Sequence, residues 1–568
     1  MKYLILFLSL FLGYTEYSFA QEPLWTQTVT VDTGYSIAEA TDIVVDKSGN
    51  TYTLCNFRTD HSFYIGADTV SSNSFAIVKI DKNGKYVWVK NMVSSPINNL
   101  PFNLSIDLQG NIYAAGTFHS AFIALDGDTL VNTKGTLMQA NYFIYKIDSN
   151  GKVIYGKNGG ECYSLYMYSP IINDEQGNLY FLGNFNSNNI VFGSDTLINT
   201  SGKAQLFFVK FDPNGNPIWA KTITGDAEIY QGAITIDPFG DILIAGTTTS
   251  RNLAFGPKTI NNIYDYGVYL AKYNTKGDVV WANIVVGNNG SKPYGPPYMY
   301  LVSSITTDHK GDIFMTGGFM IDLYISSKHY LARYIPSPLG NTDGYVAKFT
   351  KTGEPIWSFS FGKDEADFGW EVAINPNNGN LLLTGGFNSA AIKINEDYFN
   401  NPDVLEQDAG FLAEIDTMGN VVCKAIFNGG GDDWLAVAVD NDGYMYLGGD
   451  YWVHKFIIGS DTFSNPGGAE KFFVTKIAPC PGTINSVKKN VEIKDIKVFP
   501  NPVLDYLTIE VEGKTGYRIL SVIGKCLQEG VLLSKNNIID VRSISNGICI
   551  LETTNSKGER NIFRIIKE

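Results

Sequence analysis

The stretch ITIDPFGDILIAG at residues 234–246 contains the pattern that decides the fold. An apolar strand ends in Asp237, a short turn with Gly240 follows, and a second apolar strand ends in Gly246. The pattern occurs seven times, at steps of 61, 67, 63, 71, 68 and 64 residues, and its turn glycines are Gly49, Gly110, Gly177, Gly240, Gly311, Gly379 and Gly443. Self-similarity at a nearly fixed period predicts a repeat architecture.

The second half of each unit adds another hairpin, as in YLAKYNTKGDVVWAN at residues 269–283. Alternating β-formers on both sides of an Asp- or Asn-containing turn with Gly predict two antiparallel strands. The turn aspartates accept backbone hydrogen bonds and the glycines take a positive φ. We therefore interpret these aspartates as turn residues rather than catalytic acids, and each unit as four strands.

Seven four-stranded units predict an all-β, seven-bladed β-propeller, in which neighbouring blades cover each other's apolar faces. The fourth-strand position is filled only six times, by Trp88, Tyr155, Trp219, Trp281, Trp357 and Cys423. The missing strand is found at the start of the mature chain, where EPLWTQTV places Trp25 63 residues before Trp88. We expect this segment to close the ring by pairing near residues 472–476, and the propeller to span residues 21–478.

The first twenty residues have the pattern of a secretory signal peptide. Lys2 precedes an apolar run at residues 3–12, and Ser18-Phe19-Ala20 ends the segment with small residues at a cleavage site. The run is too short to span a bilayer, and no later stretch reaches the ~20 apolar residues that a membrane helix needs. We expect residues 1–20 to be removed, and a mature chain without a transmembrane segment to pass through the periplasm.

Composition excludes several classes of function. The formal net charge of −14 at pH 7 disfavours nucleic-acid binding. The five histidines are isolated and the six cysteines show no CxxC spacing, so we predict no metal site and no cofactor. The thin scatter of the cysteines does not indicate a disulfide framework.

The repeat pattern ends after Lys476. A polar linker follows at 479–490, and we expect a second, small β-sandwich domain at 491–568. It contains KVFPNPVLDYLTIEV (497–511), YRILSVIGKCLQEG (517–530) and IDVRSISNGICIL (539–551). These segments resemble the C-terminal sorting domain of type IX secretion cargo from Bacteroidetes, with Cys549 where the family commonly has an aromatic residue. The matching elements are Pro500-Asn501-Pro502, Gly524-Lys525 and Asn546-Gly547. The resemblance implies contact with the type IX secretion machinery, removal of the tail, and release or attachment at the outer cell surface.

The repeats themselves resemble the SBBP-type β-propeller repeat. GKDEADFGWEVAIN (362–375) and NGGGDDWLAVAVD (428–440) show the Gly- and Asp-containing lead-in best. This resemblance implies architecture rather than activity.

Loop lengths differ between the two ends of each blade. In an antiparallel meander, the tight Gly turns fall on one end, and the excursion after the second strand falls on the other together with the link between blades. That excursion runs about twenty residues and often carries an Ile-Gly-x-Asp-Thr phrase, as at 65–69 and 458–462. Because binding loops on a rigid scaffold usually carry specificity, we expect the long-loop face to bind ligand.

The candidate ligand-binding residues lie in links between blades. Aromatic faces beside carboxylates can stack on and hydrogen-bond a sugar or peptide. The alternative is that the tryptophans pack between blades and the aspartates cap turns. The candidates are Tyr294, Tyr298, Tyr300, Asp367, Trp370, Asp433 and Trp434.

No local signature of a nucleophile with its base is present, so no catalytic residue is assigned. The leading hypothesis is a secreted, non-enzymatic binding or scaffold protein for an extracellular glycan or protein. A polysaccharide-acting hydrolase or lyase that uses Asp367 or Asp433 at the channel mouth is the first alternative. A purely structural surface or adhesion component is the second.

Overall fold

The described residues form β-strands joined by turns and loops, as the alternating apolar residues and the turn glycines of the sequence predict. The computed structural model divides the chain into two compact units, Met1–Thr483 and Ile484–Glu568. It describes residues 23–480 and 497–567 except for 29, 32–36, 59–62, 67, 71–73, 95–102, 133–139, 163–169, 231, 289–301, 321, 326, 332–341, 364, 403–408, 430–434, 467, 512–513, 522–525 and 556–559. The expected signal peptide and most of the expected linker lie outside this part.

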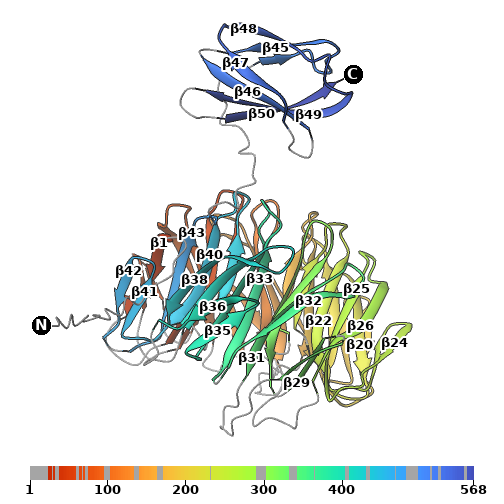
Figure 1. Cartoon of the computed structure of the whole chain (residues 1–568). Coiled ribbons are helices and arrows are strands. Elements are labelled where there is room, and N and C mark those ends of the chain that lie inside the picture. Colours follow the sequence, from red (N-terminus) through yellow and green to blue (C-terminus); the bar gives the residue numbers. More distant parts are fainter. Residues whose placement is uncertain are drawn as a thin grey trace, which may run out of the picture. The chain divides into compact units, whose positions relative to one another are not determined.

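The first unit is built from sets of four antiparallel strands in chain order (Figure 1), which we call blades 1 to 7; added hairpins extend the sheets of blades 1, 3 and 4 to six strands. Blades 1 to 3 are β3 (Ile37–Val45), β4 (Thr51–Arg58), β7 (Ser74–Ile80) and β8 (Tyr86–Ser94); β9 (Asn103–Ile106), β10 (Ile112–Phe118), β13 (Ala140–Ile147) and β14 (Val153–Cys162); and β15 (Ile171–Asn173), β16 (Leu179–Phe185), β19 (Gln205–Phe211) and β20 (Pro217–Gly225). Blades 4 and 5 are β21 (Ala233–Ile236), β22 (Ile242–Thr248), β25 (Tyr266–Tyr273) and β26 (Val279–Asn288); and β27 (Ser304–Thr307), β28 (Ile313–Phe319), β31 (Asp343–Phe349) and β32 (Pro355–Phe361). Blades 6 and 7 are β33 (Asp367–Ile374), β34 (Leu381–Phe387), β37 (Ala409–Ile415) and β38 (Val421–Asn428); and β39 (Ala436–Val439), β40 (Met445–Tyr451), β43 (Lys471–Ile477) and β1 (Pro23–Thr28).

The blades form a closed ring. Each innermost strand contacts the next one, in the order β3, β9, β15, β21, β27, β33 and β39, and β39 contacts β3 again. Between each pair of neighbouring blades lies an apolar cluster, such as the one that joins Phe314 and Val346 of blade 5 to Leu383 and Phe411 of blade 6. The all-β β-propeller fold predicted from the repeat is confirmed, and its core is distributed over the junctions between blades.

Strand β1 completes blade 7 from the other end of the chain. It pairs antiparallel with β43, with Trp25 opposite Lys476 and Thr28 opposite Phe473. Trp25 also reaches blade 1, because its Nε1 donates to the carbonyl of Lys82 at 3.1 Å and its ring lies against Gly84, a turn glycine with φ of 85°. The ring is therefore closed by backbone pairing and by an aromatic side chain on the next blade.

The excursion after each second strand folds differently from the expected loop. It contains a short hairpin: β5 (Phe63–Ile65) and β6 (Asp68–Val70), β11 (Phe122–Leu125) and β12 (Asp128–Val131), β17 (Asn189–Phe192) and β18 (Asp195–Ile198), β23 (Asn252–Phe255) and β24 (Lys258–Asn261), β29 (Asp322–Ile325) and β30 (Lys328–Leu331), β35 (Ala391–Ile394) and β36 (Asp397–Asn400), and β41 (Lys455–Ile458) and β42 (Asp461–Ser464). In three cases the hairpin pairs with the fourth strand of the preceding blade: β11 with β8, β23 with β20 and β29 with β26. Strand β5 pairs in the same way with β2 (Thr30–Val31), just after β1. The Ile-Gly-x-Asp-Thr phrase thus covers an exposed sheet edge, and less of the long-loop face is free loop than expected.

One disulfide joins the last two blades, although the spacing of the cysteines did not indicate one. Cys423, at the fourth-strand position of blade 6, is bonded to Cys480, just beyond β43. At other junctions this position holds an aromatic residue against the neighbouring turn; for example, Trp219 Nε1 donates to Thr275 O at 3.2 Å. Blade 7 has no such turn because its fourth strand comes from the N-terminus, and the disulfide replaces the missing contact.

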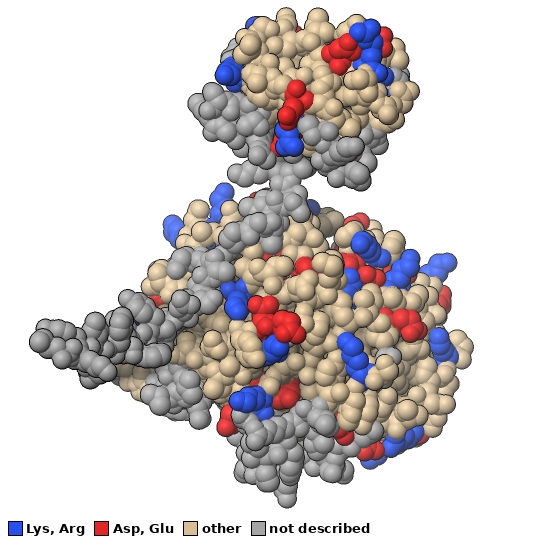
Figure 2. All heavy atoms as spheres, viewed as in Figure 1, with Lys and Arg blue, Asp and Glu red and all other residues tan. Residues whose placement is uncertain are grey.

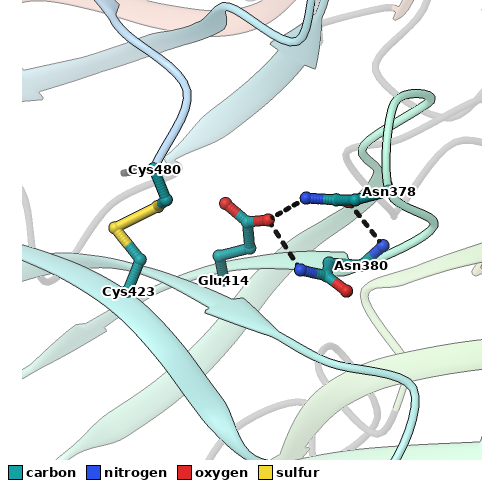
Figure 3. The surroundings of a disulfide bond; sticks show 5 residues. All are labelled: Asn378, Asn380, Glu414, Cys423 and Cys480. Atoms are coloured by element: carbon teal, nitrogen blue, oxygen red, sulfur yellow. Dashed lines mark hydrogen bonds between the residues drawn. A yellow bond between two sulfur atoms is a disulfide. The ribbon is translucent and has the colours of Figure 1, made fainter. Parts of the chain in front are cut away.

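Glu414 lies near this disulfide, and Figure 3 shows its carboxylate pointing toward two asparagines of the first turn of blade 6. Its Oε1 accepts from Asn378 Nδ2 at 2.6 Å and from Asn380 Nδ2 at 2.8 Å. The side chain is 1% exposed, and within the described ranges Oε2 has no hydrogen-bond partner. A buried carboxyl group thus stands at this position, and no ion pair joins it to a cation among the residues that the structure describes.

We predict opposite effects for two substitutions of Glu414. Glu414→Gln keeps the acceptor for both amides and replaces a buried ionisable group by a neutral one, so the free energy of unfolding should stay unchanged or rise by about 1 kcal/mol. Glu414→Ala leaves both amides without this acceptor and should lower it by roughly 2 kcal/mol. Denaturant titration followed by tryptophan fluorescence measures both, and a loss of stability in Glu414→Gln as large as in Glu414→Ala would contradict this reading.

The second unit is a small sandwich of two sheets. One contains β44 (Lys497–Phe499), β45 (Tyr506–Glu510) and β48 (Asn536–Asp540), and the other β47 (Cys526–Leu532), β46 (Thr515–Ser521), β49 (Gly547–Asn555) and β50 (Arg560–Lys567). Leu507, Ile509, Ile519 and Leu551 are fully buried between them. The predicted β-sandwich tail is therefore present.

Candidate functional site

The innermost strands surround a cavity of about 330 Å³ in the central channel. Its wall is built from the residues just before the first turn of repeats 1 to 6, because these strands stand side by side around the axis. The position four residues before the turn Asp or Asn is occupied, in blade order, by Asp42, Asn103, Pro170, Ala233, Ser304, Glu371 and Ala436. Two carboxyl groups therefore belong to one side of the ring, with only Ala436 of blade 7 between them.

Both carboxyl groups bind the backbone of the following blade. Asp42 Oδ2 accepts from Leu104 N at 2.7 Å and from Asn103 Nδ2 at 3.1 Å. Glu371 Oε2 accepts from Val437 N at 2.8 Å. Each group thus joins two blades while it lines the cavity, and this fixes its position for contact with a ligand.

Burial changes the protonation of this pair. It raises the pKa of Glu371 well above the ordinary value, and the nearby Asp42 carboxylate raises it further. Burial also raises the pKa of Asp42, against the opposing effect of its hydrogen bonds from Leu104, Asn103 and Ile43. The cavity therefore presents a carboxyl group that can donate a hydrogen bond beside one that accepts.

Two of the residues proposed from the sequence can be placed. Asp367 is fully buried, and its Oδ2 accepts from Ser389 Oγ at 2.8 Å and from Lys363 N at 3.0 Å; burial raises its pKa to about 6. It does not belong to the cavity lining. Trp370 lines the cavity but is 2% exposed and stacks on Phe368 at a centroid distance of 4.8 Å. Tyr294, Tyr298, Tyr300, Asp433 and Trp434 lie outside the described residues.

Sequence reasoning missed Asp42 and Glu371. The signal was available, because aligning the seven repeats on their turn residue puts both at the same position. Each strand also shifts register there, between Ala40 and Asp42 in β3 and between Gly369 and Val372 in β33. Such bulges re-aim side chains.

The sorting elements of the second unit are partly described. Asn501 lies between two cis prolyl bonds, to Pro500 and to Pro502, and its Oδ1 accepts from Ile566 N at 2.8 Å. This ties the Pro-Asn-Pro segment to the last strand. Asn546 and Gly547 form the entry to β49, whereas Gly524 and Lys525 are outside the described part.

Residues 497–568 match the family of secretion system C-terminal sorting domains. The match indicates export by type IX secretion to the cell surface or the extracellular space. The tail is thus the part that contacts the secretion machinery of a Bacteroidetes-type cell.

Other similarities are weaker. Over 193 residues, 31% of the chain, the sequence is 25% identical to an uncharacterized WD repeat-containing protein of Acanthamoeba polyphaga mimivirus, of whose length it covers 13%. Among solved structures, it resembles PorZ, a surface component of the type IX secretion system of Porphyromonas gingivalis (12% identity, 93% of this chain, 70% of that chain, TM-score 0.29). It also resembles the Neurospora crassa Pan2 WD40 domain (9%, 78%, 89%, 0.35) and polysaccharide lyase Uly1 (11%, 77%, 89%, 0.37). These values are too low to transfer a function.

Charges on the propeller are mixed. On the face in Figure 2, basic and acidic side chains are interspersed rather than gathered in one patch. Across the described ranges, no group of three or more His, Cys, Asp and Glu side chains is placed to hold a metal ion, and no helix is long and apolar enough to cross a membrane.

Proposed function

We propose that this exported propeller is a non-enzymatic binding protein, and that its channel takes one hydroxyl- or amine-bearing group of an extracellular glycan or protein. The observation that carries the proposal is the pair of buried carboxyl groups, Asp42 and Glu371, on the wall of a cavity. At about 330 Å³ the cavity is at the low end of ligand pockets, so it admits one sugar unit or one side chain.

Hydrogen-bonding capacity also supports binding in the channel. Asn103 Oδ1, Asn173 Oδ1 and Ser303 Oγ lie in residues of the cavity wall, and each is buried without a partner among the described residues. Buried polar atoms normally find a partner in protein, water or ligand. A ligand hydroxyl or amine would satisfy them together with the carboxyl groups.

Binding and pH dependence test this proposal together. Glycan arrays and calorimetry with the mature chain should find a ligand whose affinity falls at least tenfold in Glu371→Gln or Asp42→Asn. Glu365→Gln, an exposed Glu outside the cavity, is the matched control and should bind normally. Equal affinity in the wild type and all three variants would show that the ligand does not bind in the channel, and absence of any ligand would favour a purely structural role.

The raised pKa values set the sign of the pH effect on stability. The folded state holds protons that the unfolded state releases, so stability should fall as pH rises from about 4 through the raised pKa values of the pair. Glu371→Gln removes part of this dependence and should unfold at a midpoint that varies less between pH 5 and 9. Thermal melts over this range measure the difference, and identical pH profiles would contradict it.

The same pair supports a second candidate, a polysaccharide hydrolase or lyase with Glu371 as the proton donor and Asp42 as the base. Both are held by backbone donors of the next blade, which favours a fixed binding role over proton transfer. Release of reducing ends or of unsaturated uronate by the mature chain, abolished in Glu371→Gln, would establish the enzyme instead.

A further inference from the structure

One lysine position recurs in the third strand of the blades. It is the residue before the end of the strand, and it is filled in six of the seven by Lys79, Lys146, Lys210, Lys272, Lys348 and Lys476. Glu414 occupies it in blade 6. Each of the six ammonium groups lies inside the turn-bearing end of the propeller.

Five of these ammonium groups have an oxygen acceptor nearby. Lys79 Nζ donates to Ser149 O at 2.7 Å and Lys146 Nζ to Pro213 O at 3.1 Å. The other three pair with carboxylates: Lys210 with Asp174 at 3.3 Å, Lys272 with Asp241 at 3.3 Å, and Lys348 with Asp312 at 3.1 Å. At this position the lysine ammonium group therefore normally has a hydrogen-bond or ion-pair partner.

Lys476 differs from the other five. It is 8% exposed, and among the described residues no carboxylate or carbonyl oxygen lies within hydrogen-bond or ion-pair distance of its Nζ. The ammonium instead lies over two rings, 4.2 Å from the centroid of Tyr444 and 5.0 Å from that of Tyr446. Burial lowers its pKa. A cation in so enclosed a position gains from any acceptor that a ligand brings to it.

A cavity of about 530 Å³ adjoins this lysine, which we call the closure cavity. It is lined by Leu24 and Trp25 of β1, by Lys476, and by turn residues of blades 7 and 1. Leu24 and Lys476 belong to the two strand ends that a turn joins in the other blades, and here no turn joins them because β1 comes from the N-terminus. The cavity and the unpaired lysine thus occur together at the ring closure.

The lining suits an anionic ring. Lys47 and Lys82 add two further cations. Of the two acidic residues in the wall, Asp440 is already engaged, since its Oδ2 accepts from Tyr446 OH at 2.9 Å and its Oδ1 from Tyr444 N at 3.0 Å. Trp25 and Tyr444 supply half-buried aromatic surface, on which sugar rings stack.

We propose that the closure cavity binds a carboxylate-bearing sugar unit, whose carboxylate pairs with the Lys476 ammonium while its ring lies beside Trp25 and Tyr444. The exposed side chains of Ser48, Asn83 and Asn441 are the partners for its hydroxyl groups. This site is separate from the channel and does not depend on the function proposed for it.

Calorimetry with the mature chain at low ionic strength tests the site with three probes. Glucuronate should bind, glucose should bind at least tenfold more weakly because it lacks the carboxylate, and inorganic sulfate should bind more weakly than glucuronate because it lacks the ring. Lys476→Met should weaken glucuronate binding at least tenfold. Absence of glucuronate binding, or equal binding in Lys476→Met, would overturn the proposal. Sulfate binding as tight as glucuronate binding would show that the cavity recognises the anion and not a sugar ring, which would also overturn it.

Two control variants separate binding from folding and from the channel. Lys348→Met removes the same residue type at the equivalent position, but there it leaves Asp308 and Asp312 without their cation. Its melting temperature should fall while glucuronate binding persists, whereas Lys476→Met should melt at or above the wild-type temperature. Glu365→Gln, outside both cavities, should leave glucuronate binding unchanged, and loss of that binding in Glu371→Gln but not in Lys476→Met would place the sugar in the channel, so failure of the channel proposal and failure of this one are distinguishable.

Discussion

A chain that lacks β1 (Pro23–Thr28) is expected to lose the cooperative unfolding transition of its propeller. Blade 7 would then have three strands, and β43 would become an unpaired edge over Phe473–Ile477. The cluster between blades 7 and 1 would also lose Trp25, which packs on it from the closing strand. Because whole-domain stability is only ~5–15 kcal/mol, loss of a complete strand removes a large share of it.

Single substitutions in β1 should lower the stability of the propeller less than deletion of the strand does. Trp25→Ala should lower the free energy of unfolding by roughly 2–3 kcal/mol, somewhat below the range for a fully buried tryptophan because the ring is half-buried. Leu24→Ser is the control, since Leu24 is 54% exposed and contributes little core surface.

Complementation gives the sharpest form of this test. A peptide of residues 23–31 added to the truncated chain should bind along β43 and restore the melting transition, since strand addition to an open edge supplies the missing backbone bonds. If the truncated chain melted like the full chain, the ring would not depend on this strand.

Sequence reasoning reached the propeller because its evidence is local and repeated. Turn chemistry at positions such as Asp237 and Gly240 defines each hairpin, and the seven copies define the ring. The closing strand could be found by counting fourth-strand residues, of which Trp25 is the seventh. These inferences need no knowledge of which side chains meet in space.

The outer hairpins were less accessible to this reasoning. Strands such as β5 (Phe63–Ile65) are only three residues long, which is too short for an alternating pattern to stand out. The Gly at the centre of the phrase was a usable signal: Gly66 has φ of 61° and Gly193 has φ of 58°, as a tight turn between strands requires. What the sequence did not indicate is that the hairpin reaches back to the preceding blade.

The candidate site depended on three-dimensional neighbours, which explains what was missed. Asp42 and Glu371 lie in distant repeats and become neighbours only through ring closure. Lys476 differs from the equivalent lysines because no oxygen acceptor lies near its ammonium group among the described residues, and this cannot be read from the sequence. Asp367 was chosen for its place in a lead-in segment, and the structure shows it hydrogen-bonded to Ser389. The tyrosines of the 291–301 link remain a prediction.

Removal of the disulfide is the second change with a large expected effect. The bond between Cys423 and Cys480 closes a loop of 57 residues, and the chain-entropy relation gives about 4 kcal/mol for a loop of this length. Cys423→Ser/Cys480→Ser should therefore unfold at a clearly lower denaturant concentration. The bond also replaces the aromatic contact that other junctions have, so no other side chain at this position compensates for its loss.

Reduction provides the matched comparison for this variant. Wild-type protein in dithiothreitol should unfold at the midpoint of the double serine variant. Dithiothreitol should not shift the midpoint of the variant itself, because Cys55 and Cys549 are free, buried thiols that it does not change.

Cys480 is also where the chain leaves blade 7 toward the sorting unit, so a pull on the tail reaches Cys423 in blade 6 before it peels β43 from β1 and β40. Under force applied through the tail, the oxidised propeller should consequently open at a higher load than the reduced one, and equal opening forces would show that β43 alone holds the end of the ring.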